Sequence, residues 1–344
     1  MIIFRVDANS MIGRRHMARC VATALNIKMR GGSVLFVTRE DSDKSLLTSS
    51  FIDFVTIPSV KLSSDEGREA LEKVIEEKNA SVCVVDSADV SKVFFKELKT
   101  KCKVVLIEDY LYEIYDVDLV VNCNIYVDKL DYPTKYPKTT ETALGLYYAP
   151  IQNPFGMMGR KKNPDEIKTI LITTGDSDPD EICPGIVDCI LDRIDYNVRL
   201  RVITSKNSPT RDLLYKMSNT SSQIIIEQDV NNMDKLINVC DLAVVAADSI
   251  VYDCLNAGIP CCVFTCNSNQ QMLADTLFEN DLCIKGGDYQ RNRNKFFGSL
   301  VDGFDRIMEP EVRQRILENI DKIGMGNGSD RLAGKIMEYD KKEI

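Results

Sequence analysis

The sequence predicts an α/β protein of two Rossmann-like domains, each a doubly wound parallel sheet, that face a cleft. Three observations support this prediction. Short apolar runs alternate with amphipathic helical stretches, which is the pattern of parallel strands covered by helices. The same alternation occurs in both halves of the 344 residues. A stretch rich in charged and helix-breaking residues, at 157–164, separates the two halves.

In the first half, apolar runs of strand length are expected to form the first sheet. They are Ile2–Val6, Val34–Val37, Val82–Asp86, Val104–Glu108 and Leu119–Val121. Apolar residues at helical spacing between these runs predict helices at His16–Met29, Glu66–Lys78 and Ser91–Lys101. Such helices are needed because parallel strands cannot be joined by a tight turn.

The second half repeats this arrangement. Strands are expected at Thr169–Thr173, Leu200–Ile203, Gln223–Glu227, Leu242–Val245 and Cys261–Phe264. Helices are expected at Glu181–Ile194, Ser208–Met217, Ser249–Asn256 and Asn269–Asn280, and three helical stretches close the chain. We therefore expect one domain at residues 1–155, a linker at 156–166 and a second domain at 167–344.

Composition restricts the classes of function. The net charge of −9 argues against a general nucleic-acid-binding protein. No signal peptide and no apolar run of membrane length are recognisable, so we expect a cytoplasmic protein that binds no membrane. The 12 cysteines include no Cys-x-x-Cys pair, and one histidine cannot complete the common Cys/His zinc sites. Buried free thiols are therefore expected, with no metal or other cofactor.

The first candidate site follows the first strand. Asp7 stands at the end of that strand, where ligands bind in open α/β sheets, and its carboxylate is expected to orient a water or a sugar hydroxyl. The residues that follow it into the helix are Gly13, Arg14, Arg15, His16 and Arg19. The helix dipole and the arginines favour a neutral imidazole at His16, which suits a general base near pH 7. The alternatives are a structural histidine and arginines that contact only solvent.

A second candidate site follows the strand that ends at Val245. A helix that begins at Ser249 and Ile250 would present backbone N–H groups to a diphosphate. Asp253, one turn into this helix, is placed to accept hydrogen bonds from ribose hydroxyls. The structural alternative is that Asp248 or Ser249 only caps the helix and that Asp253 complements its dipole.

Two further loops end strands of the second half. Gly175 permits close approach of the backbone to a ligand. Asn269 and Gln270 open a helix, where their amides would either bind sugar substituents or cap the helix.

Together these segments resemble the UDP-sugar hydrolases of pseudaminic acid biosynthesis, a family also labelled spore-coat polysaccharide biosynthesis. The similar segments are, in order, RVDANSMIGRRH, VVDSADVSKVFFKELK, IEDYLYEIYDVDLVVNCNIY, KLDYPTKYP, LGLYYAPIQNPF, ILITTGDSDP and AADSIVYDCLNAGIPCCVF followed by NQ. The resemblance implies the glycosyltransferase-B architecture. It also implies hydrolysis of a UDP-diacetamido-trideoxy-hexose, UDP-2,4-diacetamido-2,4,6-trideoxy-β-L-altropyranose, to UDP and the free sugar.

The resemblance also implies roles for individual residues. His16 would be the general base that activates water at the anomeric carbon. The UDP-sugar site would be lined by Ser249, Asp253, Asn269 and Gly175, with Asn124 on the side of the amino-terminal domain. The diphosphate would be stabilised by a helix N-terminus rather than by a metal ion.

The chain departs from the motifs of this family at several positions. Arg15 replaces a glycine of Gly-x-Gly-His, and Asp248 lies in the Gly-Gly-Ser-Thr loop that should hold the diphosphate. Two like charges about 4 Å apart cost roughly 4 kcal/mol at an effective dielectric constant of 20. The other departures are Asp176 for a glycine, Ala88 for an aromatic residue, Gln152 for an arginine and Asp253 for a glutamate.

Three consequences of these departures are open. The substrate differs, Arg14 or Arg15 compensates for the acidic loop, or catalysis has been lost while the fold persists. We therefore expect a nucleotide-sugar hydrolase of surface-glycan synthesis that binds a UDP-sugar. The alternatives are a glycosyltransferase-B type sugar transferase, or a catalytically decayed paralogue that binds a sugar nucleotide weakly or a protein partner.

Overall fold

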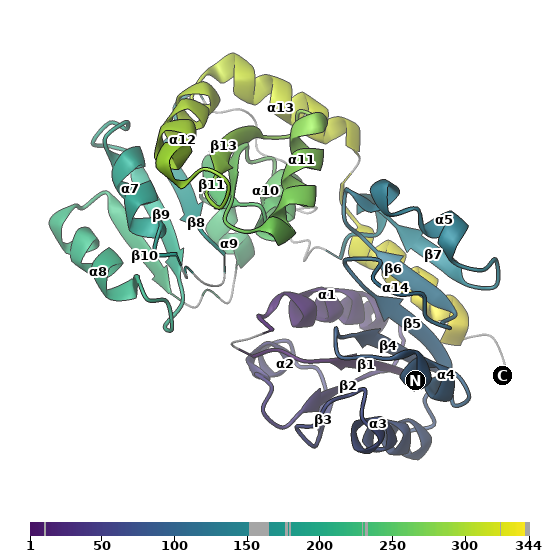
Figure 1. Ribbon diagram of the computed structural model, residues 1–344. Helices are drawn as coiled ribbons and strands as arrows, with labels where there is room; N and C mark the ends of the chain where they lie inside the picture. Colours follow the sequence, from purple (N-terminus) through teal and green to yellow (C-terminus); the bar gives the residue numbers. More distant parts are fainter. Residues whose placement is uncertain are drawn as a thin grey trace. The chain divides into compact units, whose positions relative to one another are not determined.

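The structure is a computed structural model that describes residues 1–9, 12–150, 165–175, 178, 180–228, 230, 233–323 and 325–340. The chain forms two compact units (Figure 1). The first unit comprises Met1–Asn153 and Gly326–Ile344, and the second comprises Pro154–Met325.

The first unit is built on a parallel sheet with the strand order β3-β2-β1-β4-β5-β6-β7 in the described part of the chain. Its strands are β1 (Ile2–Val6), β2 (Val34–Arg39), β3 (Phe54–Ile57), β4 (Val82–Asp86), β5 (Lys103–Ile107), β6 (Leu119–Asn122) and β7 (Glu141–Leu144). The order reverses between β1 and β4, which are hydrogen-bonded neighbours. In such sheets a crevice forms at the carboxyl ends of the strands at this point.

Helices cover both faces of the first sheet. On one face α1 (Arg15–Met29) and α14 (Gly328–Asp340) bury apolar residues such as Ile27 and Ile336 against Phe4 of β1. On the other face α3 (Asp65–Glu77) and α4 (Lys92–Leu98) bury a second set against Ile3. The short helices α2 (Ser45–Ser49) and α5 (Tyr132–Lys135) lie in the connections. The inner strands, such as β1, β4 and β6, are buried on both faces, which agrees with their almost entirely apolar sequences.

The second unit repeats this design with the strand order β10-β9-β8-β11-β12-β13. Its strands are β8 (Thr169–Thr173), β9 (Arg199–Thr204), β10 (Ile224–Gln228), β11 (Leu242–Ala246), β12 (Cys261–Thr265) and β13 (Ile284–Asp288). The helices of this unit are α7 (Cys183–Leu191), α8 (Arg211–Thr220), α9 (Met233–Asn238), α10 (Ile250–Ala257), α11 (Gln271–Glu279), α12 (Arg293–Ile307) and α13 (Pro310–Ile323). The prediction of two doubly wound parallel sheets is confirmed.

All the strands predicted from sequence are present within one or two residues, but β3, β7 and β13 were not predicted. β3 and β7 are four-residue edge strands, and β3 is mostly exposed, so neither forms a continuous apolar run. β13 contains Gly286 and Gly287, which are unfavourable in strands. They allow α12 to pack closely: a Cβ at Gly286 would lie 3.1 Å from Leu300 Cδ1 of α12, and one at Gly303 of α12 would lie 2.4 Å from Lys285 O.

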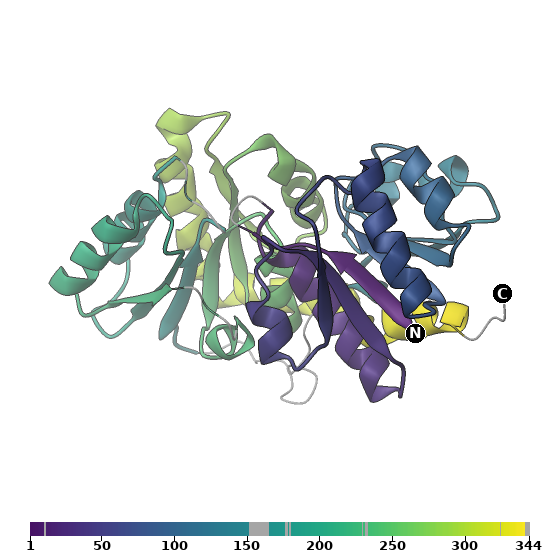
Figure 2. The ribbon, with the colours of Figure 1, turned by 90° about the horizontal axis from the view of Figure 1, so that it is seen from below.

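The last helix differs from the expectation that residues 167–344 form one domain. α14 belongs to the first unit, where it lies beside α1 (Figure 2). Its apolar face, with Leu332 and Ile336, completes the core there. A Cβ at Gly328 would lie 2.2 Å from Ala149 O, so α14 begins in close contact with the backbone of Ala149, near the end of the first of the two segments that form this unit. Residues 156–164 of the expected linker at 156–166 lie outside the described residues. Gln152 also lies outside them.

No helix of the described chain is long and apolar enough to cross a membrane.

Candidate active site

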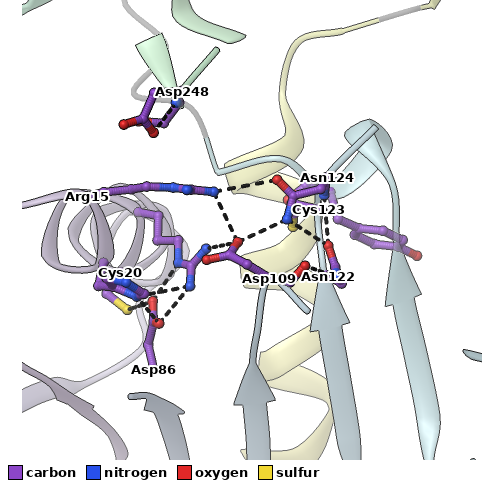
Figure 3. A network of polar contacts seen from close by, with 12 residues as sticks. Arg15, Cys20, Asp86, Asp109, Asn122, Cys123, Asn124 and Asp248 are labelled. Carbon is purple, nitrogen blue, oxygen red and sulfur yellow. Dashed lines mark hydrogen bonds and ion pairs between the residues drawn. The ribbon is translucent and has the colours of Figure 1, made fainter. Parts of the chain in front are cut away.

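A network of charged side chains lies at the carboxyl edge of the first sheet, where the strand order reverses (Figure 3). β4 ends at Asp86, and Asp109 follows β5. The first turns of α1, which follows β1, bring Arg15, His16 and Arg19 to the same edge. Parallel strands place their carboxyl ends together, so residues distant in sequence meet here.

Asp86 is the centre of the network. Its carboxylate is almost fully buried, with 1% of its side chain exposed, and it contacts His16 Nδ1 at 2.6 Å. Arg19 donates to both of its oxygens, from Nε at 2.6 Å and from Nη2 at 2.7 Å. Burial by itself would raise the pKa of Asp86, but attraction to Arg19 and His16 outweighs it and holds the pKa well below its usual range. Asp86 is therefore ionised at neutral pH.

The contact with Asp86 assigns the proton on the imidazole of His16. An unprotonated Nδ1 would bring a lone pair against a carboxylate oxygen at 2.6 Å, so we place the proton on Nδ1, donating to Asp86. Arg19 Nη2, at 3.1 Å from the same Nδ1, then donates to Asp86 rather than to the ring. Nε2 is left as the basic nitrogen, and it has no hydrogen-bond partner among the described residues. The side chain of His16 is 25% exposed.

Asp109 joins the network to the loop after β6. It accepts hydrogen bonds from Arg19 Nη1 at 2.8 Å, Arg15 Nη2 at 3.0 Å and Asn124 Nδ2 at 2.9 Å. Burial would raise the pKa of Asp109, but Arg19 and Arg15 outweigh this effect and hold it well below its usual range. Asn122, the last residue of β6, accepts hydrogen bonds from the backbone and side-chain nitrogens of Asn124. Asn124 is thereby fixed in place.

The formal charges of this network cancel. The guanidinium groups of Arg15 and Arg19 face the carboxylates of Asp86 and Asp109, and Nδ1–H of His16 adds a further donor to Asp86. An imidazole held by a buried carboxylate is the arrangement that orients a general base and stabilises the imidazolium formed when the base accepts a proton.

Glu108 is a second unusual acid on this edge. Burial, the largest effect, raises its pKa to about 7, and the nearby Tyr132 and Tyr136 hydroxyls only partly offset this rise. Its Oε1 is buried without a hydrogen-bond partner, as is the hydroxyl of Tyr136. Glu108 therefore titrates near neutral pH.

Other residues expected at this site lie outside the network. Asp7 is 6% exposed and forms a separate buried ion cluster, in which it accepts from Arg5 at 2.8 Å and from the backbone N–H of Arg39 at 2.8 Å. Gly13 has a φ of +77° and donates its N–H to Asn9 O. Arg14 contacts Ser45, the first residue of α2, at 2.5 Å, and Asp43 at 3.5 Å.

In the second unit, the loops after β8 and β11 lie next to each other. Gly175 has a φ of +97°, and a Cβ there would lie 3.5 Å from Asp248 Oδ2. At the start of α10 the N–H of Ser249 donates to Asp248 Oδ1 at 2.6 Å, so this one donor is bonded within the chain. That the start of α10 holds a diphosphate stays a prediction. Ser249 is the N-cap residue of α10, but its side chain makes no capping hydrogen bond.

The remaining residues of the second site are placed as follows. Ile250 begins α10, and Asp253 lies in its first turn. Asn269 and Gln270 lie in a 3₁₀ turn, Ser268–Gln270, and the cap of this turn is Asn267, whose Oδ1 accepts from the N–H of Asn269. Gln270 accepts from the N–H of Cys266 at 2.7 Å. Asp176 lies outside the described residues.

The carboxyl edge of the second sheet is acidic. Burial raises the pKa of the Cys266 thiol to about 12, and four nearby carboxylates add to this rise. They belong to Asp178, Asp180, Asp248 and Asp288. Arg293 pairs with Asp180 at 2.9 Å and Arg291 pairs with Asp288 at 3.6 Å, so part of this charge is balanced. The remaining negative charge opposes the binding of a diphosphate.

Asp86, Asp109 and Glu108 were not among the site residues predicted from the sequence. The signal was present, because each is an acidic residue at the end of a buried strand, as Asp7 is. Of the residues predicted for the first unit, the structure brings together His16, Arg15, Arg19 and Asn124. Ala88 lies exposed in the loop after β4.

Comparisons with known proteins agree with the fold. No protein-family model matches the chain. The chain is 25% identical over 262 residues to UDP-2,4-diacetamido-2,4,6-trideoxy-β-L-altropyranose hydrolase of Campylobacter jejuni, an alignment that covers 74% of this chain and 87% of the hydrolase.

Two solved glycosyltransferases are similar in structure. MurG of Acinetobacter baumannii superposes with a TM-score of 0.67 at 12% identity, covering 98% of this chain and 99% of MurG. The spinosyn rhamnosyltransferase SpnG, in complex with thymidine diphosphate, superposes with a TM-score of 0.63 at 14% identity, covering 98% and 99%. The chain therefore has the fold of the glycosyltransferases of the B type, with two Rossmann-like parallel-sheet domains.

Proposed function

We propose that this protein is a nucleotide-sugar hydrolase that releases UDP from a UDP-diacetamido-trideoxy-hexose by attack of water at the anomeric carbon. The observation that carries the proposal is the 2.6 Å contact between His16 and the buried, ionised Asp86. The similarity in sequence to a hydrolase of such a sugar nucleotide supports the choice of substrate.

In the proposed reaction, Nε2 of His16 accepts a proton from water as the water oxygen forms a bond to the anomeric carbon. The bond from that carbon to the phosphate oxygen breaks, and its electron pair leaves with UDP. Asp86 stabilises the imidazolium through Nδ1–H. A positioned general base of this kind contributes about 10²- to 10⁴-fold to the rate.

We assign nucleotide binding to the second unit. Gly175, Ser249, Ile250, Asp253, Asn269 and Gln270 lie on loops or helix starts that follow strands of its sheet. Asp248 is the residue that sets the affinity in this proposal, because its carboxylate takes the N–H of Ser249. We expect weak binding of UDP, strengthened when the charge of Asp248 is removed.

The test is incubation of the protein with UDP-2,4-diacetamido-2,4,6-trideoxy-β-L-altropyranose in ¹⁸O-labelled water, with no acceptor present. We expect UDP without label and free sugar with ¹⁸O at the anomeric carbon. Label in the phosphate of UDP would mean attack at phosphorus, and no turnover under these conditions would reject the hydrolase.

A sugar transferase is the second candidate, because the structural neighbours are glycosyltransferases. The same dyad would then deprotonate an acceptor hydroxyl instead of water. Release of UDP that depends strictly on an added acceptor would favour the transferase over the hydrolase.

A further inference from the structure

Three tyrosines form a stack at the carboxyl edge of the first sheet. Tyr110 and Tyr112 lie in the loop after β5, and Tyr126 lies beyond β6. The rings of Tyr110 and Tyr126 are parallel to within 19°, with centroids 6.1 Å apart. The ring of Tyr112 follows at 5.4 Å from that of Tyr110, tilted by 37°.

The stack runs from the core to the surface. Tyr126 is 3% exposed, whereas Tyr112 is 79% exposed. Leu111 and Ile114, on either side of Tyr112 in the sequence, pack against the hydrophobic core, so the loop is anchored while Tyr112 is directed outward. A large aromatic ring on a fixed loop costs little conformational entropy when a ligand packs on it.

The stack adjoins the charged network around His16. The hydroxyl of Tyr126 donates to Asp109 O at 3.2 Å, and Asp109 also binds Arg15. Tyr110 lies close enough to Asp109 and Arg15 for both charges to affect its pKa, although burial is the main cause of its rise. Aromatic faces beside fixed hydrogen-bonding groups are well suited to sugars, whose C–H faces pack on rings while their hydroxyl and amide groups bond to polar neighbours.

The charge balance of the edge favours a neutral ligand. Arg15 and Arg19 are matched by Asp86 and Asp109, so no net charge is available to attract an anion. Resting on the proposed function, we propose that Tyr112, at the exposed end of the stack and supported by Tyr110, forms a stacking subsite for the neutral pyranose ring of the substrate.

The first test compares steady-state kinetics on the UDP-diacetamido-trideoxy-hexose. Tyr112→Ala is expected to raise KM about tenfold, because it removes one ring contact, and to leave kcat within about twofold of wild type. Tyr112→Phe keeps the ring and is expected to restore the wild-type KM. Tyr196→Ala is the matched control, since Tyr196 is 87% exposed and lies in the second unit. An unchanged KM in Tyr112→Ala would overturn the subsite while leaving the hydrolase intact.

The second test separates the subsite from the reaction. Saturation-transfer NMR with the free sugar, 2,4-diacetamido-2,4,6-trideoxy-altropyranose, is expected to show transfer to its ring protons in wild type and in Tyr112→Phe, and to lose it in Tyr112→Ala. That result in a protein without hydrolase activity would support the subsite and reject the proposed function. Absence of transfer in wild type, or transfer that persists in Tyr112→Ala, would overturn the subsite.

Discussion

The buried carboxylate of Asp86 determines what His16 can do. Asp86 is ionised because two donors of Arg19 and Nδ1–H of His16 face it in a buried position, and this fixes the ring with Nε2 as the basic atom. Arg19 was expected to bind substrate. In the structure its guanidinium group contacts Asp86, Asp109 and His16, which favours a positioning role.

Asp86 supports the proposed role of the first site, whereas Asp248 weakens the binding expected at the second site. It supplies a negative charge where a diphosphate is expected. Asp248→Gly frees the N–H of Ser249 and removes a like charge, so we expect UDP to bind about 10- to 100-fold more tightly by titration calorimetry. Asp248→Asn, which keeps the size but not the charge, should give an intermediate gain. Weaker binding in both variants would show that Asp248 itself contacts the nucleotide.

Glu108 links stability to pH. Its pKa is raised from 4.5 to about 7, so the folded protein binds more protons than the unfolded chain between these values, and stability falls as pH rises through this range. Glu108→Gln removes this dependence. We expect the variant to match wild type near pH 4.5 and to exceed it by about 2–3 kcal/mol at pH 8, measured by urea unfolding.

The matched control for Glu108 is Glu77→Gln on the exposed end of α3. Parallel pH profiles of wild type and Glu108→Gln would show that the Glu108 carboxyl is not buried in its neutral form.

How much of the site the sequence could predict depended on residue type. His16 was identifiable because it is the single histidine and follows a buried strand. Its partner was not, because Asp86, Asp109 and Asp7 all occupy equivalent strand ends, and only the strand order places β4 next to β1. Asp7, the acid nearest in sequence, pairs with Arg5 and Arg39 instead.

At the scale of elements, α14 is the part whose position the sequence did not reveal. Its apolar stripe predicts a helix that packs against a hydrophobic core, but the stripe does not indicate whether this is the core of the first or of the second sheet. It packs on α1, and Arg30 of the first unit binds Asp330 through two contacts of 2.7 Å.

Shortening a buried side chain in α14 should therefore weaken the first unit. Ile336 is fully buried, and Ile336→Ala is expected to cost about 2–4 kcal/mol. Hydrogen exchange should show faster exchange in α1 and the first sheet, with the second unit unchanged.

The equivalent change in the second unit provides the comparison. Ile316 of α13 is also fully buried, and Ile316→Ala should affect the second unit alone. Faster exchange of the second unit in Ile336→Ala would contradict the placement of α14.

At the scale of the whole molecule, the class of fold was readable because the central strands of both sheets are buried and apolar almost throughout and alternate with helices. The edge strands β3, β7 and β13 and the division of the chain were not readable, since they depend on contacts between distant segments. The two sheets share one strand order, yet their carboxyl edges differ: the first has balanced charges around a histidine, and the second is acidic. The histidine of the first edge leads us to assign the chemistry to the first unit. We assign nucleotide binding to the loops of the second unit, where the acidic residues predict a weak affinity.

The most direct test of His16 as the general base is to measure the turnover of the UDP-sugar by His16→Ala together with the affinity of this variant for UDP. We predict that kcat falls about a thousandfold because the general base is gone, while the dissociation constant for UDP stays within about twofold of wild type. Turnover of His16→Ala at the wild-type rate would contradict the assignment of His16 as the base that activates water.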